Sequence, residues 1–318
     1  MGSHNESIPT IRWGIIGTGL ISSWFTKDIT TSRLHLPTIS PVPTVYSDYQ
    51  SVYNDSAVDI IYIGTPHALH KQHCLDAIAA GKHILCEKAF TINAAEAREV
   101  LAAAAEKKVF IMEAMWLRFR PLVTSLRKVL YEDKLIGDVR RVFCDFGLDM
   151  DLSSLPDSSR LKDPAMGAGK STPANKPQII ATQTLRNGID IASSFILTYP
   201  GTGRQGILTS TIEAWTPETF LRIEGTDGYI LIEGIAASAP RSFTVYPKVN
   251  PDADKVKGKK HKFEVEGMGF YFEADAVAES IAKGEKENVV MSHGETVRVL
   301  EILDEIRRQG GARFPQEG

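Results

Sequence analysis

Two short stretches carry the residue types that could do redox chemistry with a nucleotide. Gly17-Thr18-Gly19-Leu20-Ile21-Ser22 has the glycine spacing of a dinucleotide-binding turn, and Cys86-Glu87-Lys88-Ala89 places a carboxylate beside an amine. The N–H groups of such a turn, and of the helix after it, attract a pyrophosphate. An amine in the same crevice can take or share the proton of a hydroxyl that is being oxidised. Together the two stretches predict a nicotinamide oxidoreductase with Lys88 at the hydride site.

The glycine turn lies between a strand pattern and a helix pattern. Arg12–Ile16 is an apolar run of strand length. After the glycines, large apolar residues recur at helical spacing, at Leu20, Ile21, Trp24, Phe25 and Ile29. Gly17 permits the tight turn, and Gly19 removes the Cβ that would block a pyrophosphate. Leu20 and Ile21 begin the helix whose free N–H groups would face that anion.

The following segments repeat the strand and helix pattern. Strands are expected at Val58–Gly64, His83–Cys86 and Val109–Met112, and helices at His70–Ala80 and Asn93–Glu106. Thr65, Pro66 and His67 follow the first of these strands directly, and Glu87 and Lys88 follow the second. Loops at the carboxyl ends of parallel strands line the ligand crevice. The repeated order predicts an N-terminal Rossmann domain, a doubly wound parallel sheet of the α/β class.

These motifs resemble one known family. The segments Tyr62–His67 (YIGTPH), Cys86–Asn93 (CEKAFTIN) and Glu113–Arg118 (EAMWLR) are similar to the glucose-fructose oxidoreductase/inositol dehydrogenase/MocA family. Within it, the likeness is to dimeric dihydrodiol dehydrogenases and fungal NADP-dependent D-xylose 1-dehydrogenases. The resemblance implies hydride transfer between a nicotinamide cofactor, NADP with NAD possible, and a sugar or diol hydroxyl. It also implies a homodimer.

Composition agrees with a globular, two-domain protein. The 318 residues, 43% of them hydrophobic, are enough for a dinucleotide-binding domain over 1–121 and a substrate-binding and dimerisation domain over 122–318. A net charge of −3 supplies no basic footprint for nucleic acid, and no apolar run reaches the ~20 residues that span a membrane. The three cysteines lack metal-ligand spacing, and we expect them to be reduced and the protein to be cytoplasmic.

The second half is expected to be an α+β domain with a large, mostly antiparallel sheet. Alternating patterns predict strands at Val139–Phe146, Gln178–Thr184, Ile191–Thr198, Gly206–Ala214, Thr219–Gly225 and Gly228–Glu233. Gly225-Thr226-Asp227-Gly228 is a hairpin signal between the last two. One sheet face would be covered by helices and the other would pair with a second copy. C-terminal helices near Tyr271–Ala282 and Ser292–Gln309 would brace the first domain.

Each residue of the expected site also has a structural interpretation. Burial and a positively charged oxidised nicotinamide would both favour the neutral amine of Lys88, with Glu87 holding its orientation; the alternative is an exposed ion pair at a strand end. The resemblance adds Thr65, Pro66, His67, Trp116 and Arg118 as cofactor contacts, and it favours Trp116 as a wall of an apolar pocket. Trp116, Phe146 and Trp215 are otherwise ordinary core aromatics. His67, His70 and His73 recur every third residue, but no carboxylate or cysteine completes a metal site.

The chain departs from the family pattern in three places. Ser22 stands where the third glycine usually falls, so helix and strand should pack less closely there. Between Leu34 and Tyr46 the prolines leave no central strand, so the position that selects NAD or NADP is missing. After Met166 the family's Asp-x-Gly-x-Tyr/His helix is replaced by loop composition through Lys170–Pro177. A shortened, weakly active or inactive dimeric cofactor-binding relative, or a regulatory module on an old cofactor fold, therefore remains an alternative to an active dehydrogenase.

Overall fold

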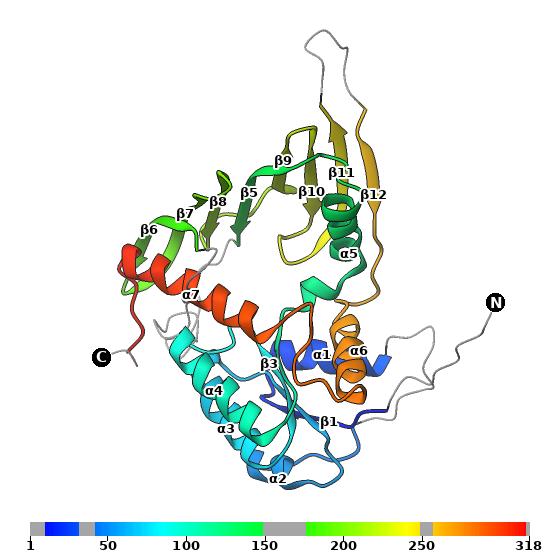
Figure 1. Ribbon diagram of the computed structural model, residues 1–318. Coiled ribbons are helices and arrows are strands. Elements are labelled where there is room, and N and C mark those ends of the chain that lie inside the picture. Colours follow the sequence, from blue (N-terminus) through cyan, green and yellow to red (C-terminus); the bar gives the residue numbers. More distant parts are fainter. Residues whose placement is uncertain (1–9, 32–41, 149–175, 249–256, 316–318) are drawn as a thin grey trace, which may run out of the picture. The chain divides into compact units, whose positions relative to one another are not determined.

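The computed structural model describes residues 10–31, 42–148, 176–248 and 257–315, which form two compact units (Figure 1). The first unit comprises Met1–Thr91, Ala95–Phe119 and Glu266–Val297, and the second comprises Ile92–Ala94, Arg120–Val265 and Arg298–Gly318. Glu266–Val297, which includes the first of the two expected bracing helices, clusters with the first unit. Most of the expected loop at 170–177 lies outside the described residues. No helix in the described ranges is long and apolar enough to cross a membrane.

The first unit holds a four-stranded, wholly parallel sheet, which confirms the expected Rossmann-like class. Its strands are β1 (Trp13–Ile16), β2 (Ile60–Ile63), β3 (His83–Glu87) and β4 (Ile111–Ala114), and they pair in that order. The accompanying helices are α1 (Leu20–Thr31), α2 (Tyr49–Asn54), α3 (His70–Ala79), α4 (Ala94–Lys107) and α6 (Tyr271–Ala282). In Figure 1, α3 and α4 lie on one side of this sheet and α1 and α6 on the other.

β1 is an edge strand within the described part of the chain. A doubly wound sheet reverses its strand order beside the first strand, and ligands bind where the order reverses. Here β1, β2, β3 and β4 follow one another without a reversal. Thr44–Tyr46 is not a strand, and the six-residue α2 follows it. The described sheet therefore corresponds to one half of the doubly wound arrangement.

Aromatic packing and one buried carboxylate hold the first unit together. Phe25 of α1 stacks on Tyr62 of β2 with ring centroids 3.9 Å apart, and Phe270 meets Phe25 edge to face. Asp28, 4% exposed, accepts hydrogen bonds from the N–H groups of Met268, Gly269 and Phe270 at 3.0, 2.7 and 3.0 Å. Charged acceptors make the stronger hydrogen bonds, so Asp28 anchors the turn that leads into α6.

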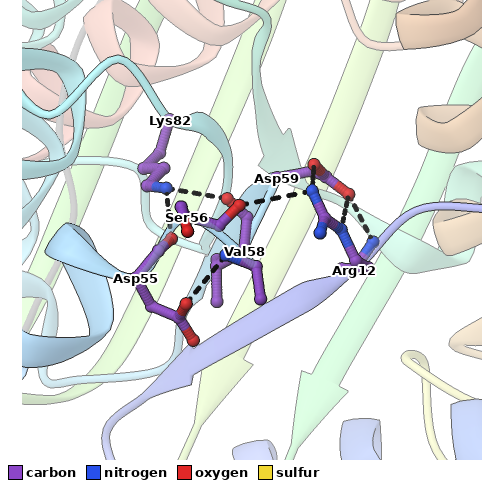
Figure 2. A network of polar contacts seen from close by, with 7 residues as sticks. Arg12, Asp55, Ser56, Val58, Asp59 and Lys82 are labelled. Atoms are coloured by element: carbon purple, nitrogen blue, oxygen red, sulfur yellow. Dashed lines mark hydrogen bonds and ion pairs between the residues drawn. The ribbon is translucent and has the colours of Figure 1, made fainter.

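A polar network joins the amino-terminal ends of the strands (Figure 2). The Arg12 guanidinium bonds both carboxylate oxygens of Asp59, at 2.6 and 2.9 Å, and it lowers the pKa of that carboxyl. The Lys82 ammonium donates to the backbone carbonyls of Asp55 and Val58. This edge is opposite the carboxyl ends of the strands, where ligands of such sheets bind. Arg12 and Lys82 are therefore structural cations and not phosphate ligands.

The second unit is an eight-stranded sheet in the order β12-β11-β10-β9-β5-β8-β7-β6, mostly antiparallel as expected. Its strands are β5 (Val139–Gly147), β6 (Gln178–Arg186), β7 (Ile189–Tyr199), β8 (Arg204–Thr211), β9 (Thr219–Gly225), β10 (Gly228–Gly234), β11 (Pro240–Pro247) and β12 (Lys259–Lys262). Only the pairing of β5 with β8 is parallel. The expected hairpin joins β9 to β10. α5 (Pro121–Arg127) continues into a π-helical turn, η3 (Lys128–Glu132), and α7 (His293–Gly310) follows later in the chain.

The two faces of this sheet differ in what covers them. Val142, Ile223, Ile230 and Val245 lie in one cross-strand row and belong to a core cluster with residues of α5 and η3. On the opposite face, register places a second row side by side: Ile180, Ile196, Ile207, Phe143 and Arg222. Ile180 is 71% exposed and Ile196 is 37% exposed. Within the described residues, this second row leaves apolar surface uncovered.

Candidate active site

The glycine turn closes tightly on the neighbouring strand end. Gly17 has a φ of +84°, and a Cβ there would lie 2.8 Å from the backbone of Gly64 and Thr65. Only glycine satisfies both the conformation and the close approach. Gly19 faces open space, and α1 begins at the next residue, Leu20, which is 65% exposed. The turn thus leaves room above Gly19 and presents the first N–H groups of a 12-residue helix to it.

Ser22, which stands where the third glycine usually falls, packs against the end of the neighbouring strand. Its side chain is buried and lies against Gly64, where an added Cβ would come within 2.0 Å of the Ser22 hydroxyl oxygen. The absence of a side chain at Gly64, which follows β2, leaves the room that the Ser22 side chain occupies. The helix and the strand are therefore in contact through Ser22 and Gly64, and looser packing than in the family stays a prediction.

The segment after β2 lies at the same edge as the glycine turn. Register aligns Ile16, Ile63 and Cys86 in neighbouring strands, so the residues that follow each of them share one edge of the sheet. Thr65 is buried, and its hydroxyl lies 3.0 Å from Nδ1 of His73. Pro66 precedes a short 3-10 helix, η1, formed by His67–Leu69.

Glu87 and Lys88 occupy the end of β3 in the same row. Glu87 is buried; its carboxylate accepts a 2.8 Å hydrogen bond from the Tyr62 hydroxyl and a 3.2 Å bond from the backbone N–H of Lys88. Burial and the neighbouring carboxylates raise the pKa of Tyr62, so the hydroxyl remains a donor. The Tyr62 hydroxyl of β2 thus fixes the Glu87 carboxylate, and that carboxylate in turn restrains the backbone N–H of Lys88.

The Lys88 side chain is exposed, so the expectation that it is buried is wrong. It follows the last residue of β3 and is open to solvent among the described residues. Across those same residues its ammonium has no ion-pair partner, and the alternative of an exposed Glu87–Lys88 ion pair is wrong as well.

Two buried carboxyls behind this edge were not found by sequence reasoning. Glu113 of β4 accepts a 3.1 Å hydrogen bond from the N–H of Phe90, and burial raises its pKa to about 7. Glu273 of α6 is fully buried, neither of its oxygens has a hydrogen-bond partner within the described structure, and burial raises its pKa well above the usual range. Burial disfavours the carboxylate form, so both groups tend to be protonated acids. Their helical or strand periodicity is the only signal in the sequence.

Trp116 and Arg118 make contacts that compete with a ligand role. Both belong to η2 (Trp116–Phe119). Trp116 is 8% exposed and packs on Phe270 with ring centroids 4.9 Å apart, so it belongs to the aromatic core of the first unit, and its role as the wall of a pocket stays a prediction. The Arg118 guanidinium forms a 2.7 Å ion pair with Glu295. By contrast Trp215 and Phe146 are exposed, against the ordinary core interpretation.

Comparison with known proteins identifies the fold at this site. Residues 11–115 match the model of the oxidoreductase family with an NAD-binding Rossmann fold, GFO_IDH_MocA. The chain is 33% identical to a trans-1,2-dihydrobenzene-1,2-diol dehydrogenase of Mus musculus, across 96% of this chain and 99% of that protein. The enzyme of the same name from Homo sapiens is 31% identical with the same coverage. The chain belongs to the Gfo/Idh/MocA oxidoreductase family.

Solved structures share this family fold across most of the chain. A levoglucosan dehydrogenase in complex with NADH and levoglucosan superposes with a TM-score of 0.76 at 19% identity, covering 95% of this chain and 97% of that one. An aldose-aldose oxidoreductase from Caulobacter crescentus has a TM-score of 0.68 at 18% identity, with 83% and 80% coverage. The alignment with the mouse enzyme spans 337 positions, more than the 318 residues available, so it contains gaps in this chain.

The residues present fit part of a dinucleotide of the kind that this family binds. The open space at Gly19 and the start of α1 suit a pyrophosphate, and Lys88 lies at the same sheet edge. The adenosine end normally contacts the strand beside β1 on its other edge, and no such strand exists among the described residues. The described residues therefore fit the pyrophosphate and nicotinamide half of the dinucleotide. No described strand lies where the adenosine half would bind.

Proposed function

We propose that the chain is a cytoplasmic NAD(P)-dependent dehydrogenase that moves a hydride between the nicotinamide and a hydroxyl of a sugar or diol, with NADP as the cofactor and NAD as a possible substitute. The observation that carries the proposal is the row formed by the glycine turn, the Thr65–His67 segment and Glu87-Lys88 at one sheet edge. The diol dehydrogenases that align over nearly the whole chain support the substrate class. The levoglucosan dehydrogenase, solved with NADH and a sugar derivative, supports the sugar alternative.

Each residue of the proposed site has a separate task. A bound nicotinamide supplies the hydride acceptor. The Lys88 amine takes the hydroxyl proton as the C–H bond breaks, and it returns that proton in the reverse direction. Glu87 fixes the Lys88 backbone through the 3.2 Å N–H contact, and Tyr62 fixes Glu87. Gly17 and Gly19, with the Leu20 end of α1, hold the pyrophosphate.

The test of Lys88 is its replacement by methionine, which keeps the length of the side chain and removes the amine. Turnover of a trans-dihydrodiol or of D-xylose with NADP should fall by about 10²–10⁴-fold, the range for losing a general acid or base, while the dissociation constant of NADPH stays within about threefold. Lys283→Met, an exposed lysine paired with Glu279, is the control. Equal turnover of Lys88→Met and the parent would refute the assignment.

The test of the cofactor site is Gly19→Val, monitored by NADPH fluorescence or by energy transfer from Trp13 or Trp24. A valine side chain would fill the space above the turn, so affinity should fall steeply for NADPH and NADH alike. Titrating both cofactors against the parent decides which is preferred. Unchanged affinity in Gly19→Val would place the pyrophosphate elsewhere.

A weakly active or inactive relative is the second candidate function. It is favoured by the described half-sheet and by the absence of the Asp-x-Gly-x-Tyr/His motif from the sequence, because Lys88 then lacks the partners usual in the family. Catalysis depends on holding reactants in a near-attack geometry, so the loss of partners lowers the rate. Steady-state assays with NADP and NAD against xylose, glucose and a dihydrodiol discriminate the two candidates. Turnover near the enzyme median of about 10 s⁻¹ would exclude the inactive form.

We also propose a homodimer through the uncovered face of the eight-stranded sheet. The row of Ile180, Ile196, Ile207 and Phe143 is apolar, and the Arg222 guanidinium lies 4.4 Å from the Phe143 ring centroid. Exposed apolar patches of this kind mark protein interfaces. Ile180→Glu should shift the molar mass measured by light scattering from dimer to monomer, whereas Ile235→Glu, at another exposed isoleucine, should not. A monomeric parent would exclude the proposal.

A further inference from the structure

His70 connects two segments of the proposed active site. It is the first residue of α3 and is 1% exposed. Its Nε2 atom lies 2.8 Å from the carbonyl oxygen of Thr65, and its Nδ1 atom lies 2.9 Å from the carbonyl oxygen of Ala89. Thr65 follows β2 by two residues, and Ala89 follows Lys88 directly. One imidazole ring therefore spans the two loops that leave adjacent strands.

The ring acts where the sheet no longer holds these loops. The pairing of β2 with β3 ends at Ile63 and Cys86. Beyond that row, backbone hydrogen bonds between the two strands cease, although the loops must stay close for the site to form. The His70 ring lies between the two loops there and can donate a hydrogen bond to the carbonyl of one of them, Thr65 or Ala89. A buried side chain that hydrogen-bonds the backbone of a loop fixes that loop more precisely than packing alone.

The protonation state of His70 determines whether the ring donates hydrogen bonds to one or to both of the Thr65 and Ala89 carbonyls at the same time. Burial lowers its pKa to about 4, with a small contribution from neighbouring His73, while the carbonyls of Thr65, Ala89 and Phe90 oppose this change. His67 packs edge to face on the ring, with centroids 6.4 Å apart. A neutral ring has one N–H, so each tautomer donates to one of the two carbonyls. Exchange between the tautomers lets the ring bond either loop.

We propose that His70 is a positioning residue for Lys88: in the tautomer with the proton on Nδ1 it donates to the Ala89 carbonyl, and so it fixes the backbone from which the Lys88 amine reaches the substrate. The inference rests on the proposed role of Lys88. Glu87 holds the N–H of Lys88 from one side, and His70 holds the carbonyl one residue later from the other. Lys88 itself is exposed and has no side-chain partner within the described residues, so its position depends on these backbone restraints.

The first experiment measures the loop and not the activity. Hydrogen exchange of peptides that contain Glu87–Phe90 is compared in the parent, His70→Leu and His73→Leu. His73 also contacts Thr65, through its hydroxyl, but does not reach Ala89, so it is the matched control. Exchange in this segment should rise by about tenfold in His70→Leu, as for the loss of one net hydrogen bond of about 1.4 kcal/mol, and should be unchanged in His73→Leu. Equal exchange in the parent and in His70→Leu overturns the proposal.

The second experiment asks whether His70 acts through Lys88. His70→Leu should lower kcat by about 10²-fold, the scale of a misplaced catalytic group, with little change in the dissociation constant of NADPH. In a Lys88→Met background the same substitution should change the residual rate by less than about threefold. An equal loss in both backgrounds overturns the positioning role and assigns His70 to stability alone.

Two further controls keep the outcomes separate. His70→Gln retains an amide donor and should recover part of kcat and of the exchange protection. If His70→Leu does not fold, His70→Gln should show raised exchange and lowered kcat together, and a variant with only one of the two changed, or with neither, overturns the proposal. If Lys88→Met is as active as the parent, the proposed function fails and the positioning role fails with it. In that case the exchange result still reports whether His70 holds the loop.

Discussion

The pH dependence of stability should carry the signature of Glu113. Its pKa rises from 4.5 to about 7 in the folded protein because it is fully buried. The folded state therefore binds this proton more tightly than the unfolded chain does. The contribution to the free energy of unfolding is complete below pH 4.5 and is lost as the pH rises through about 7. At about 1.4 kcal/mol per pH unit, this loss amounts to about 3 kcal/mol.

Glu113→Gln isolates that contribution, because an amide has the shape of the protonated acid and does not titrate. Urea unfolding of the parent and the variant should give free energies within about 1 kcal/mol at pH 5, and at pH 8.5 the variant should be more stable by about 3 kcal/mol. His70, His73 and His83 have pKa values lowered by burial, so they act in the opposite direction below pH 6.5, and they cancel in the difference. Parallel curves for the two proteins across this range would refute the buried-acid assignment.

Three further predictions concern packing and reactivity. Asp28→Ala should lower the free energy of unfolding by about 1.5–3 kcal/mol, measured by urea titration, because three buried N–H groups lose a charged acceptor; a change below about 0.5 kcal/mol would contradict this. Gly64→Ala should destabilise the protein by about 1–3 kcal/mol, because the added methyl group would clash with Ser22. Adding Ser22→Gly should recover part of this loss, and equal melting temperatures of the single and double variants would contradict the clash. Burial raises the pKa of Cys86 well above its usual range and that of Cys144 to about 11. Both thiols should therefore react slowly with a disulfide reagent in the native protein and fast in urea, and rapid labelling of the native protein would contradict their burial.

Much of the fold was predictable because its strands are continuous apolar runs and its helices are long and periodic. β2 was expected over Val58–Gly64 and occupies Ile60–Ile63, and α6 was expected and found at Tyr271–Ala282. α2 was missed because six residues are too short for a period, although Asp48 caps it through the N–H of Ser51. β11 and β12 were missed because the first begins and ends in proline and the second consists of lysines and a histidine.

The site was predictable in its positions and less so in its surroundings. The row of the glycine turn, Thr65 and Lys88 follows from strand ends alone. The exposure of Lys88 does not, because coverage of a strand end depends on distant segments of the chain. Glu273 was beyond sequence reasoning for a related reason, since a carboxyl buried without a partner is rare and has no local pattern.

The discontinuity of the first unit has a consequence during synthesis. Phe25, Tyr62 and Trp116 belong to a core that also needs Phe270 and its neighbours in α6, and about 150 residues of the second unit are made between them. The parallel sheet can pair strand by strand as it leaves the ribosome, because each strand neighbours the next in sequence. Its aromatic face nevertheless stays open until α6 arrives. At about 5–20 residues per second the nascent chain exposes that face for roughly seven to thirty seconds, and we expect chaperones to bind this intermediate.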